Sequence, residues 1–212
     1  MESFPEETLL PSAVTNLDIA YLDNLKSLEY KGLHHLTSLR ELKIRFCPKL
    51  QSITEEGLPS SLSSLVIYHC PELESFPKAG LPLTLESLEI ICCNKLISGR
   101  MHWNLQNLQH LLHFSIAGCE NVESFPEERL LPSSLSSLKI WRLQNLKSIN
   151  CKGLQHLTSL RKLEMLNCIK LQSMPEQELP PSISSLIIKN CPLLKRRRFH
   201  KPLTLDTTKR EE

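Results

Sequence analysis

The chain has 212 residues, enough for one globular domain or one modest repeat array. Hydrophobic residues make up 41% of it and charged residues 23%, an ordinary balance for a folded protein that argues against wholesale disorder. The net charge of only +2 removes any bulk electrostatic case for binding nucleic acid or a membrane surface, and no apolar run approaches the roughly 18 residues of a membrane span.

The amino-terminal stretch MESFPEETLLP is acidic and lacks the basic and apolar regions of a secretory signal peptide. The chain contains eight cysteines, and nothing in the sequence points to a secretory route. We therefore expect free thiols in a reducing compartment. The predicted location is the cytoplasm, with the nucleus as an alternative.

An apolar pattern recurs eight times along the chain, at intervals of 23 to 26 residues. In each copy, apolar residues stand three and five places after the first one, and a Cys or Leu follows three places later. The copies begin at Val14, Leu39, Leu62, Leu85, Leu111, Leu135, Leu160 and Ile183. We expect a short strand in each copy, at 17–19, 42–44, 65–67, 88–90, 114–116, 138–140, 163–165 and 186–188. One copy cannot bury its apolar side alone, so stacked copies should share a continuous core.

The segments between the strands predict a largely irregular second side. Stretches such as GLPSS and FPEERLLPSS combine Gly, Pro and Ser, which break regular structure. GLHHLTSL and GLQHLTSL should each form a short helical turn, and no long helix is expected. A longer repeat, with an offset of 121 residues, joins ESFPEETLLPS at Glu2 to ESFPEERLLPS at Glu123, which indicates a duplicated block.

The eightfold pattern resembles the leucine-rich repeat. This resemblance implies an α/β leucine-rich-repeat solenoid, arc- or horseshoe-shaped, with a concave parallel β-sheet and an irregular convex side. The place of the recurring Cys commonly holds Asn in that family. We expect a buried ladder of free thiols there, because cysteine is small, readily buried and a weak hydrogen-bond donor. A zinc site involving Cys70 lacks paired ligands at a suitable spacing, so no metal is expected.

The phrases SSLSSLVIYHCPELESFPKAGLP and LPPSISSLIIKNCPLL are similar to the carboxy-terminal repeats of plant intracellular nucleotide-binding, leucine-rich-repeat disease-resistance proteins of the coiled-coil class. The resemblance covers almost the whole chain and predicts a repeat domain over residues 1–194, which starts mid-repeat. Residues 195–212, including KRRRFHK, should form a basic, disordered tail. The family's Trp-containing ending is not found there.

The family resemblance also implies a function and partners. In that family the repeats keep the nucleotide-binding switch inactive and help to recognise pathogen effectors. The expected partners are a pathogen effector or a guarded host protein, together with the nucleotide-binding domain of the same parent receptor. No phosphate-loop sequence of the G-x-x-x-x-G-K-[ST] type occurs. No cofactor is therefore expected in this chain, and ADP or ATP only in a longer parent protein.

Partner binding is expected on the concave face, at the positions that alternate with the buried ones. Aromatic residues and Arg dominate protein interfaces, and a field of mixed charge favours specificity over bulk attraction. The predicted partner-binding residues are Tyr21, Lys43, Arg45, Phe46, Tyr68, His69, Glu89, Lys139, Trp141 and Arg142. Lys162, Glu164 and Lys189 should stand beside them.

Three alternatives remain open at this point. CPKLQSITEEGL resembles a phrase of leucine-rich-repeat substrate receptors of ubiquitin ligases, although only one copy does so. A stand-alone truncated repeat protein is the second alternative. An enzyme is the third, but neither G-x-S-x-G nor H-E-x-x-H occurs, and Cys151, expected off the ladder and exposed, lacks a catalytic partner. We therefore expect a non-enzymatic protein.

Overall fold

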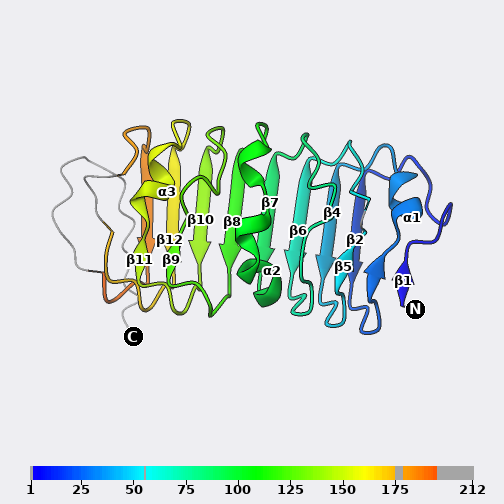
Figure 1. The fold of residues 1–212 in the computed structure, drawn as a ribbon, viewed down its shortest axis with the longest axis horizontal. Helices are drawn as coiled ribbons and strands as arrows, with labels where there is room; N and C mark the ends of the chain where they lie inside the picture. The colour runs from blue at the N-terminus through cyan, green and yellow to red at the C-terminus, as the bar shows by residue number, and fades with distance from the viewer. Residues whose placement is uncertain (1, 55, 175–178, 195–212) are drawn as a thin grey trace.

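One parallel eight-stranded sheet runs through the molecule in a computed structural model that describes residues 2–54, 56–174 and 179–194 (Figure 1). Its order is β13-β12-β10-β8-β7-β6-β4-β2, so the strands lie side by side in chain order. The strands are β2 (Asn16–Ala20), β4 (Glu41–Arg45), β6 (Ser64–Tyr68), β7 (Ser87–Ile91), β8 (His113–Ala117), β10 (Ser137–Trp141), β12 (Lys162–Leu166) and β13 (Ser185–Lys189). The solenoid of eight stacked strands is thus confirmed.

Alternation along each strand sends every second side chain into the core. In β4, Leu42 and Ile44 are fully buried, whereas Lys43 and Arg45 are half-buried on the other face. The register pairs equal positions of neighbouring repeats, such as Leu42 with Leu65. The apolar residues of every repeat therefore stack into one continuous core along the solenoid.

The recurring cysteine enters the core where the chain turns after the strand. Cys47, Cys70, Cys93, Cys119 and Cys168 are fully buried, and all eight cysteines are free thiols. The Cys70 thiol donates to the backbone carbonyls of Tyr68 (3.6 Å) and Ile44 (3.9 Å), so it ties its own strand end to the preceding repeat. The predicted buried ladder is confirmed.

Two further observations concern the thiols. Burial raises the pKa of the Cys119 thiol above its usual range, which keeps it in its neutral form. Cys151 was expected to lie exposed, and this expectation was wrong: its side chain is only 3% exposed. The first turn of helix α3 (Cys151–Gln155) packs it against the core, so it is not a surface thiol.

Short helices cover the second face of the sheet (Figure 1). Helix α1 (Tyr30–His34) and helix α3 (Cys151–Gln155) confirm the two predicted helical turns, each starting two residues early. The longest interval between repeats adds helix α2 (Asn94–Ser98) and two 3-10 turns, η1 (Arg100–His102) and η2 (Leu105–Asn107). After η1, Trp103 packs its ring against Phe76 and Phe114, at centroid distances of 5.5 and 6.2 Å.

The helix-bearing side also carries short parallel strands. Strands β1 (Ser3–Phe4), β3 (Ser27–Leu28) and β5 (Ser52–Ile53) form a second parallel ladder, and β9 (Ser124–Phe125) pairs with β11 (Ser148–Ile149). These pairs lie in the recurring E-S-F-P type phrases. The same period that aligns the long strands also aligns these two-residue strands, and most of the remaining residues between the long strands form turns and irregular structure, as predicted for the convex side.

Two predicted segments lie beyond these elements. The boundary at residue 194 stays a prediction, since the predicted tail, 195–212, and the mid-repeat start at Met1 lie outside the described residues. Within the described part of the chain, no helix is long and apolar enough to cross a membrane.

Candidate protein-binding surface

The helix-free face of the sheet carries the first, third and fifth residues of each strand, and we call these residues the concave face. The third residues form a row of Asp18, Lys43, Val66, Glu89, Ser115, Lys139, Glu164 and Ile187. The fifth residues form a parallel row of Ala20, Arg45, Tyr68, Ile91, Ala117, Trp141, Leu166 and Lys189. Neighbours within a row are about 4.8 Å apart, the usual spacing between strands.

The ten predicted binding residues divide into two groups. Six of them lie on strands and point to the concave face: Lys43, Arg45, Tyr68, Glu89, Lys139 and Trp141. The other four, Tyr21, Phe46, His69 and Arg142, were expected on strands but lie one residue beyond a strand end. We call the eight residues at this position the strand-end row: Tyr21, Phe46, His69, Cys92, Gly118, Arg142, Asn167 and Asn190.

Every residue of the strand-end row has a left-handed backbone, with φ between 51° and 65°. This turn lets the next residue, a Cys or Leu, point into the core. The backbone N–H still continues the ladder, as when Phe46 N donates to Tyr68 O at 2.9 Å. For a residue with a β-carbon the left-handed conformation costs about 1–2 kcal/mol, and only Gly and Asn adopt it readily. The bulky residues of this row are therefore strained.

Four rings gather at the carboxyl ends of the first three strands, and we call Tyr21, Phe46, Tyr68 and His69 the aromatic shelf. Tyr21 stacks on Phe46 with a centroid distance of 4.8 Å and an interplanar angle of 9°. The Phe46 ring meets Tyr68 edge-on at 5.0 Å and lies 5.6 Å from His69. Such ring pairs contribute about 0.5–1.5 kcal/mol each. Tyr21 nevertheless remains 68% exposed, so much of the shelf faces solvent.

Ion pairs neutralise most of the charged side chains on the concave face. Arg45 Nε donates to Asp18 Oδ1 at 3.0 Å, and this hydrogen bond raises the pKa of the guanidinium. The Lys43 ammonium lies 3.0 Å from Glu41 and, with the Asn16 amide, lowers the pKa of that carboxyl. Sequence analysis did not select Asp18 or Glu41. The repeat register pairs Asp18 with Lys43, and alternation along β4 places Glu41 on the same face as Lys43, so both acidic residues could have been predicted.

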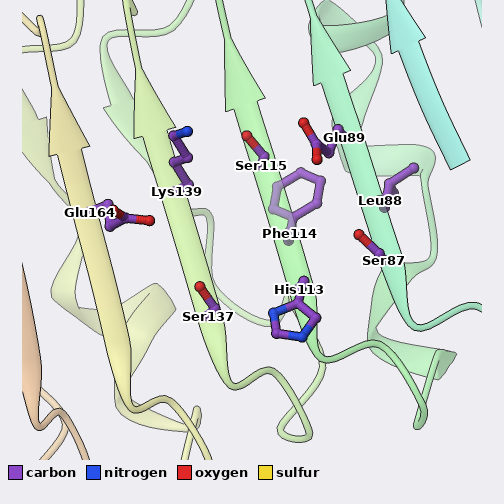
Figure 2. Close-up of a pocket in the computed structure, with 9 residues that line it drawn as sticks. All are labelled: Ser87, Leu88, Glu89, His113, Phe114, Ser115, Ser137, Lys139 and Glu164. Atoms are coloured by element: carbon purple, nitrogen blue, oxygen red, sulfur yellow. The ribbon is translucent and has the colours of Figure 1, made fainter. Parts of the chain in front are cut away.

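A pocket of about 140 Å³ opens in the middle of the concave face (Figure 2). Its lining residues are Ser87, Leu88, Glu89, His113, Phe114, Ser115, Ser137, Lys139 and Glu164. Glu89, Ser115 and Lys139 lie side by side on β7, β8 and β10. The hollow exists because the side chain of Ser115 is much smaller than those of its two neighbours. A cavity of about 150 Å³ holds one benzene-sized group, so this pocket suits a single side chain of a partner.

Trp141 borders this pocket on the carboxyl side of the strands. Its indole Nε1 donates to Ser115 Oγ at 3.3 Å, and the Lys139 Nζ lies 5.4 Å from the centre of its ring. This cation–π contact draws the Lys139 ammonium towards the indole. Sequence analysis missed His113 and Ser115, because a polar residue at a strand position carries no signal by itself.

The pocket has few features of a catalytic or metal site. Within the described ranges, His113 forms no hydrogen bond to any of the pocket serines, so the nucleophile–base contact of a hydrolase is not made. Across the same residues, no group of three or more His, Cys, Asp or Glu side chains could hold a metal ion. The polar groups here are arranged as a surface for contact.

The duplicated block shows which surfaces changed between its two copies. Twelve concave and strand-end positions of β2, β4 and β6 align with those of β10, β12 and β13, and only Ser64 matches its twin, Ser185. The eleven changed pairs are Asn16/Ser137, Asp18/Lys139, Ala20/Trp141, Tyr21/Arg142, Glu41/Lys162, Lys43/Glu164, Arg45/Leu166, Phe46/Asn167, Val66/Ile187, Tyr68/Lys189 and His69/Asn190. Three of these pairs reverse the sign of the charge.

The rest of the block changed far less. Of nine core pairs on the same strands and turns, eight are identical: Leu17/Leu138, Ile19/Ile140, Leu22/Leu143, Leu42/Leu163, Cys47/Cys168, Leu65/Leu186, Ile67/Ile188 and Cys70/Cys191. Exposure alone does not explain the difference. Several exposed pairs off the concave face are also identical, namely Glu2/Glu123, Lys26/Lys147, Lys31/Lys152, Thr37/Thr158, Arg40/Arg161, Lys49/Lys170 and Gln51/Gln172.

Comparison with one solved structure supports the fold. The leucine-rich-repeat domain of the type III effector XopL superposes with a TM-score of 0.55 at 20% identity, covering 86% of this chain and 64% of that domain. CroV588, a circular leucine-rich-repeat protein, matches with a TM-score of 0.43 at 15% identity, over 92% of this chain and 37% of its own. No protein-family model matches the sequence.

A curated protein of Arabidopsis thaliana named "Putative disease resistance protein" is 40% identical over 99 residues. The chain is a leucine-rich-repeat solenoid, similar in sequence to part of a plant disease resistance protein. The aligned region is 46% of this chain and 7% of that relative, so the solenoid spans a small part of the relative's length. The resemblance to plant disease-resistance repeats inferred from the sequence is thereby confirmed over the 99 aligned residues.

Proposed function

We propose that this leucine-rich-repeat solenoid is a protein-recognition module of a plant immune receptor, and that its concave face binds the partner. One observation supports this most directly: the duplicated blocks keep their core and much of their remaining surface but differ at eleven of twelve concave and strand-end positions. A surface that changes on a retained scaffold is suited to recognising different chemistry with the same fold.

The similarity to part of a disease resistance protein supports a finer role, which we propose as follows. The module senses a pathogen effector or a guarded host protein, and it contacts the nucleotide-binding domain of a longer parent, which it helps to hold inactive. It acts in the cytoplasm, with the nucleus as a second location. The module itself carries out no reaction and needs no cofactor, and any ADP or ATP belongs to the parent.

The test is a double substitution at the concave face, Trp141→Ala with Arg142→Ala. Trp141 borders the central pocket and Arg142 follows it at the strand end, and truncating interface residues of these types can cost 2 kcal/mol or more, about 30-fold in affinity. We expect capture of the partner from pathogen-challenged leaf extract, quantified by mass spectrometry, to fall by about that factor. Circular dichroism should show an unchanged fold.

The matched control changes two exposed side chains on the helix-bearing face, Met101→Ala with Lys152→Ala. This variant should capture the partner as well as the original chain does. Equal capture by the concave-face variant would remove Trp141 and Arg142 from the binding site, and loss of capture by the control alone would move the site to the other face.

A further inference from the structure

Three bulky residues of the aromatic shelf adopt a backbone conformation that disfavours them. Tyr21, Phe46 and His69 have φ values of 58°, 51° and 54°. Of the other five repeats, three place Gly118, Asn167 or Asn190 at the same position, residue types that adopt left-handed φ far more readily, and two place Cys92 or Arg142 there. The repeat itself therefore does not require a ring there.

Packing into the core does not account for the rings of Tyr21 and His69, whereas Phe46 is half-buried by contacts with the other rings of the shelf. Tyr21 is 68% exposed and His69 is also exposed, so these side chains bury little surface in the core. Strained residues that the fold does not need are concentrated at functional sites. The twin block makes the same point at two of the three positions, because Asn167 and Asn190 replace Phe46 and His69 on an equivalent scaffold, while Arg142 replaces Tyr21.

The two halves of the concave face also differ in charge. Around the aromatic shelf, the concave and strand-end residues of β2, β4 and β6 have a formal charge of zero. Their four charged side chains form two ion pairs, Glu41 with Lys43 and Asp18 with Arg45. The twin strands β10, β12 and β13 carry the basic residues Lys139, Arg142, Lys162 and Lys189 and one acidic residue, Glu164, a formal charge of +3. The face is aromatic and neutral at one end and basic at the other.

The spacing of the two ends sets the size of a ligand that reaches both. Strand β4, which precedes Phe46, is four sheet positions from β10, which carries Lys139 (Figure 1). At about 4.8 Å per position, the two ends are about 19 Å apart. An extended segment covers this distance with about six residues, at about 3.3 Å per residue.

We propose that the aromatic shelf docks aliphatic side chains of a partner protein segment whose acidic residues, about 19 Å further along the sheet, contact Lys139 and Arg142. The inference rests on the proposed function and adds the chemistry and direction of the partner. Aliphatic groups cover the exposed ring faces of Tyr21 and Phe46, and carboxylates complement the basic half.

The test uses a phage-displayed library of random 16-residue peptides, selected on the full chain at about 0.15 M salt. We expect enriched peptides to carry a Leu, Ile, Val or Met cluster and, separated from it, an Asp or Glu cluster. Their affinity should fall at least tenfold with Phe46→Asn and with Lys139→Glu. The matched control is Tyr30→Asn, since Tyr30 stacks on His34 at 4.9 Å on the helix-bearing side, and it should leave affinity unchanged.

Stability measurements separate binding from packing. Phe46→Asn removes three ring contacts but relieves the left-handed strain, and Asn occupies the twin position, so the variant should melt within about 5 °C of the original chain. A variant that melts well below it would give the ring a structural role and overturn the inference.

The remaining outcomes are also decisive. Peptides that lose affinity with Trp141→Ala but not with Phe46→Asn would overturn the role of the aromatic shelf and leave the concave-face proposal standing. Peptides whose affinity is unchanged by both Trp141→Ala and Phe46→Asn would overturn both the aromatic-shelf proposal and the concave-face proposal. Enrichment of basic peptides, or of none, would overturn the inference about the partner's chemistry.

Discussion

At the scale of single residues, the buried thiol at each turn replaces a stronger hydrogen-bonding group. The Cys70 thiol lies 3.6 Å from Tyr68 O and 3.9 Å from Ile44 O, and thiols of this kind are weak donors. Both carbonyl oxygens are hydrogen-bond acceptors, so a side chain at this place must donate a hydrogen bond or at least carry no negative charge. An amide meets this requirement, which explains why Asn suits the same place in other leucine-rich repeats.

This chemistry leads to a paired substitution at Cys70. Cys70→Asp would aim a carboxylate at two carbonyl oxygens in a fully buried place, and we expect it to lower the free energy of unfolding at pH 7 by about 3–5 kcal/mol. Cys70→Asn has nearly the same shape but donates hydrogen bonds, so its effect should be much smaller. Urea unfolding monitored by circular dichroism measures both.

The pH dependence of the same pair gives an independent check. Burial should raise the pKa of the introduced carboxyl above its value in the unfolded chain. The folded state then binds the extra proton, so the deficit of Cys70→Asp should shrink as the pH falls and grow as it rises through the folded-state pKa. A deficit that does not change with pH, or an equal loss in Cys70→Asn, would contradict the buried-ladder interpretation.

At the scale of elements, a glycine sets how closely each short helix approaches the second ladder. A β-carbon at Gly153 in α3 would lie 2.2 Å from Pro126 O and 2.8 Å from Glu127 O. A β-carbon at the twin residue, Gly32 in α1, would lie 2.1 Å from Pro5 O. These contacts are with backbone atoms, which cannot move away as a flexible side chain could. A glycine is therefore required where each short helix crosses the E-S-F-P phrase.

We therefore expect Gly153→Ala to be destabilising. Forcing a methyl group against this backbone should lower the free energy of unfolding by about 1–3 kcal/mol, as overpacking does. Gly99→Ala is the matched control, because its β-carbon would have its nearest contact at 3.5 Å. Thermal melts of both variants measure the difference, and equal melting temperatures would mean that α3 shifts away without loss.

At the scale of the whole molecule, stability should vary along the solenoid. Repeats contact only their neighbours, so an outer strand has one stacking partner and an inner strand has two. In β2, Leu17 is only half-buried, whereas Leu65 and Ile67 of β6 are fully buried. The outer strands of the sheet, β2 and β13, each pair with one neighbour.

Hydrogen exchange followed by mass spectrometry measures this gradient. Amides of β7 and β8 should exchange at least about tenfold more slowly than those of β2, because the outer repeat opens without unfolding the rest. Equal protection along all the strands would show that the array unfolds as one cooperative unit. The chain with Gly153→Ala offers a comparison, since its loss of protection should centre on α3 and β9.

Sequence alone predicts the solenoid, the eight strands, the buried cysteine ladder and the two helical turns. These features depend on a local apolar pattern repeated every 23 to 26 residues, which dictates the same burial in each copy. It also identified Lys43, Arg45, Tyr68, Glu89, Lys139 and Trp141 as concave-face residues, because alternation along a strand fixes which side a residue faces.

The folded structure determines how those residues combine. It placed Phe46 on a left-handed turn instead of a strand, buried Cys151, paired Arg45 with Asp18 and opened a pocket over Ser115. Each of these facts depends on a neighbouring repeat more than 20 residues away or on a turn that redirects a side chain. Periodicity predicts which residues are buried, whereas contacts between repeats decide what the exposed residues can bind.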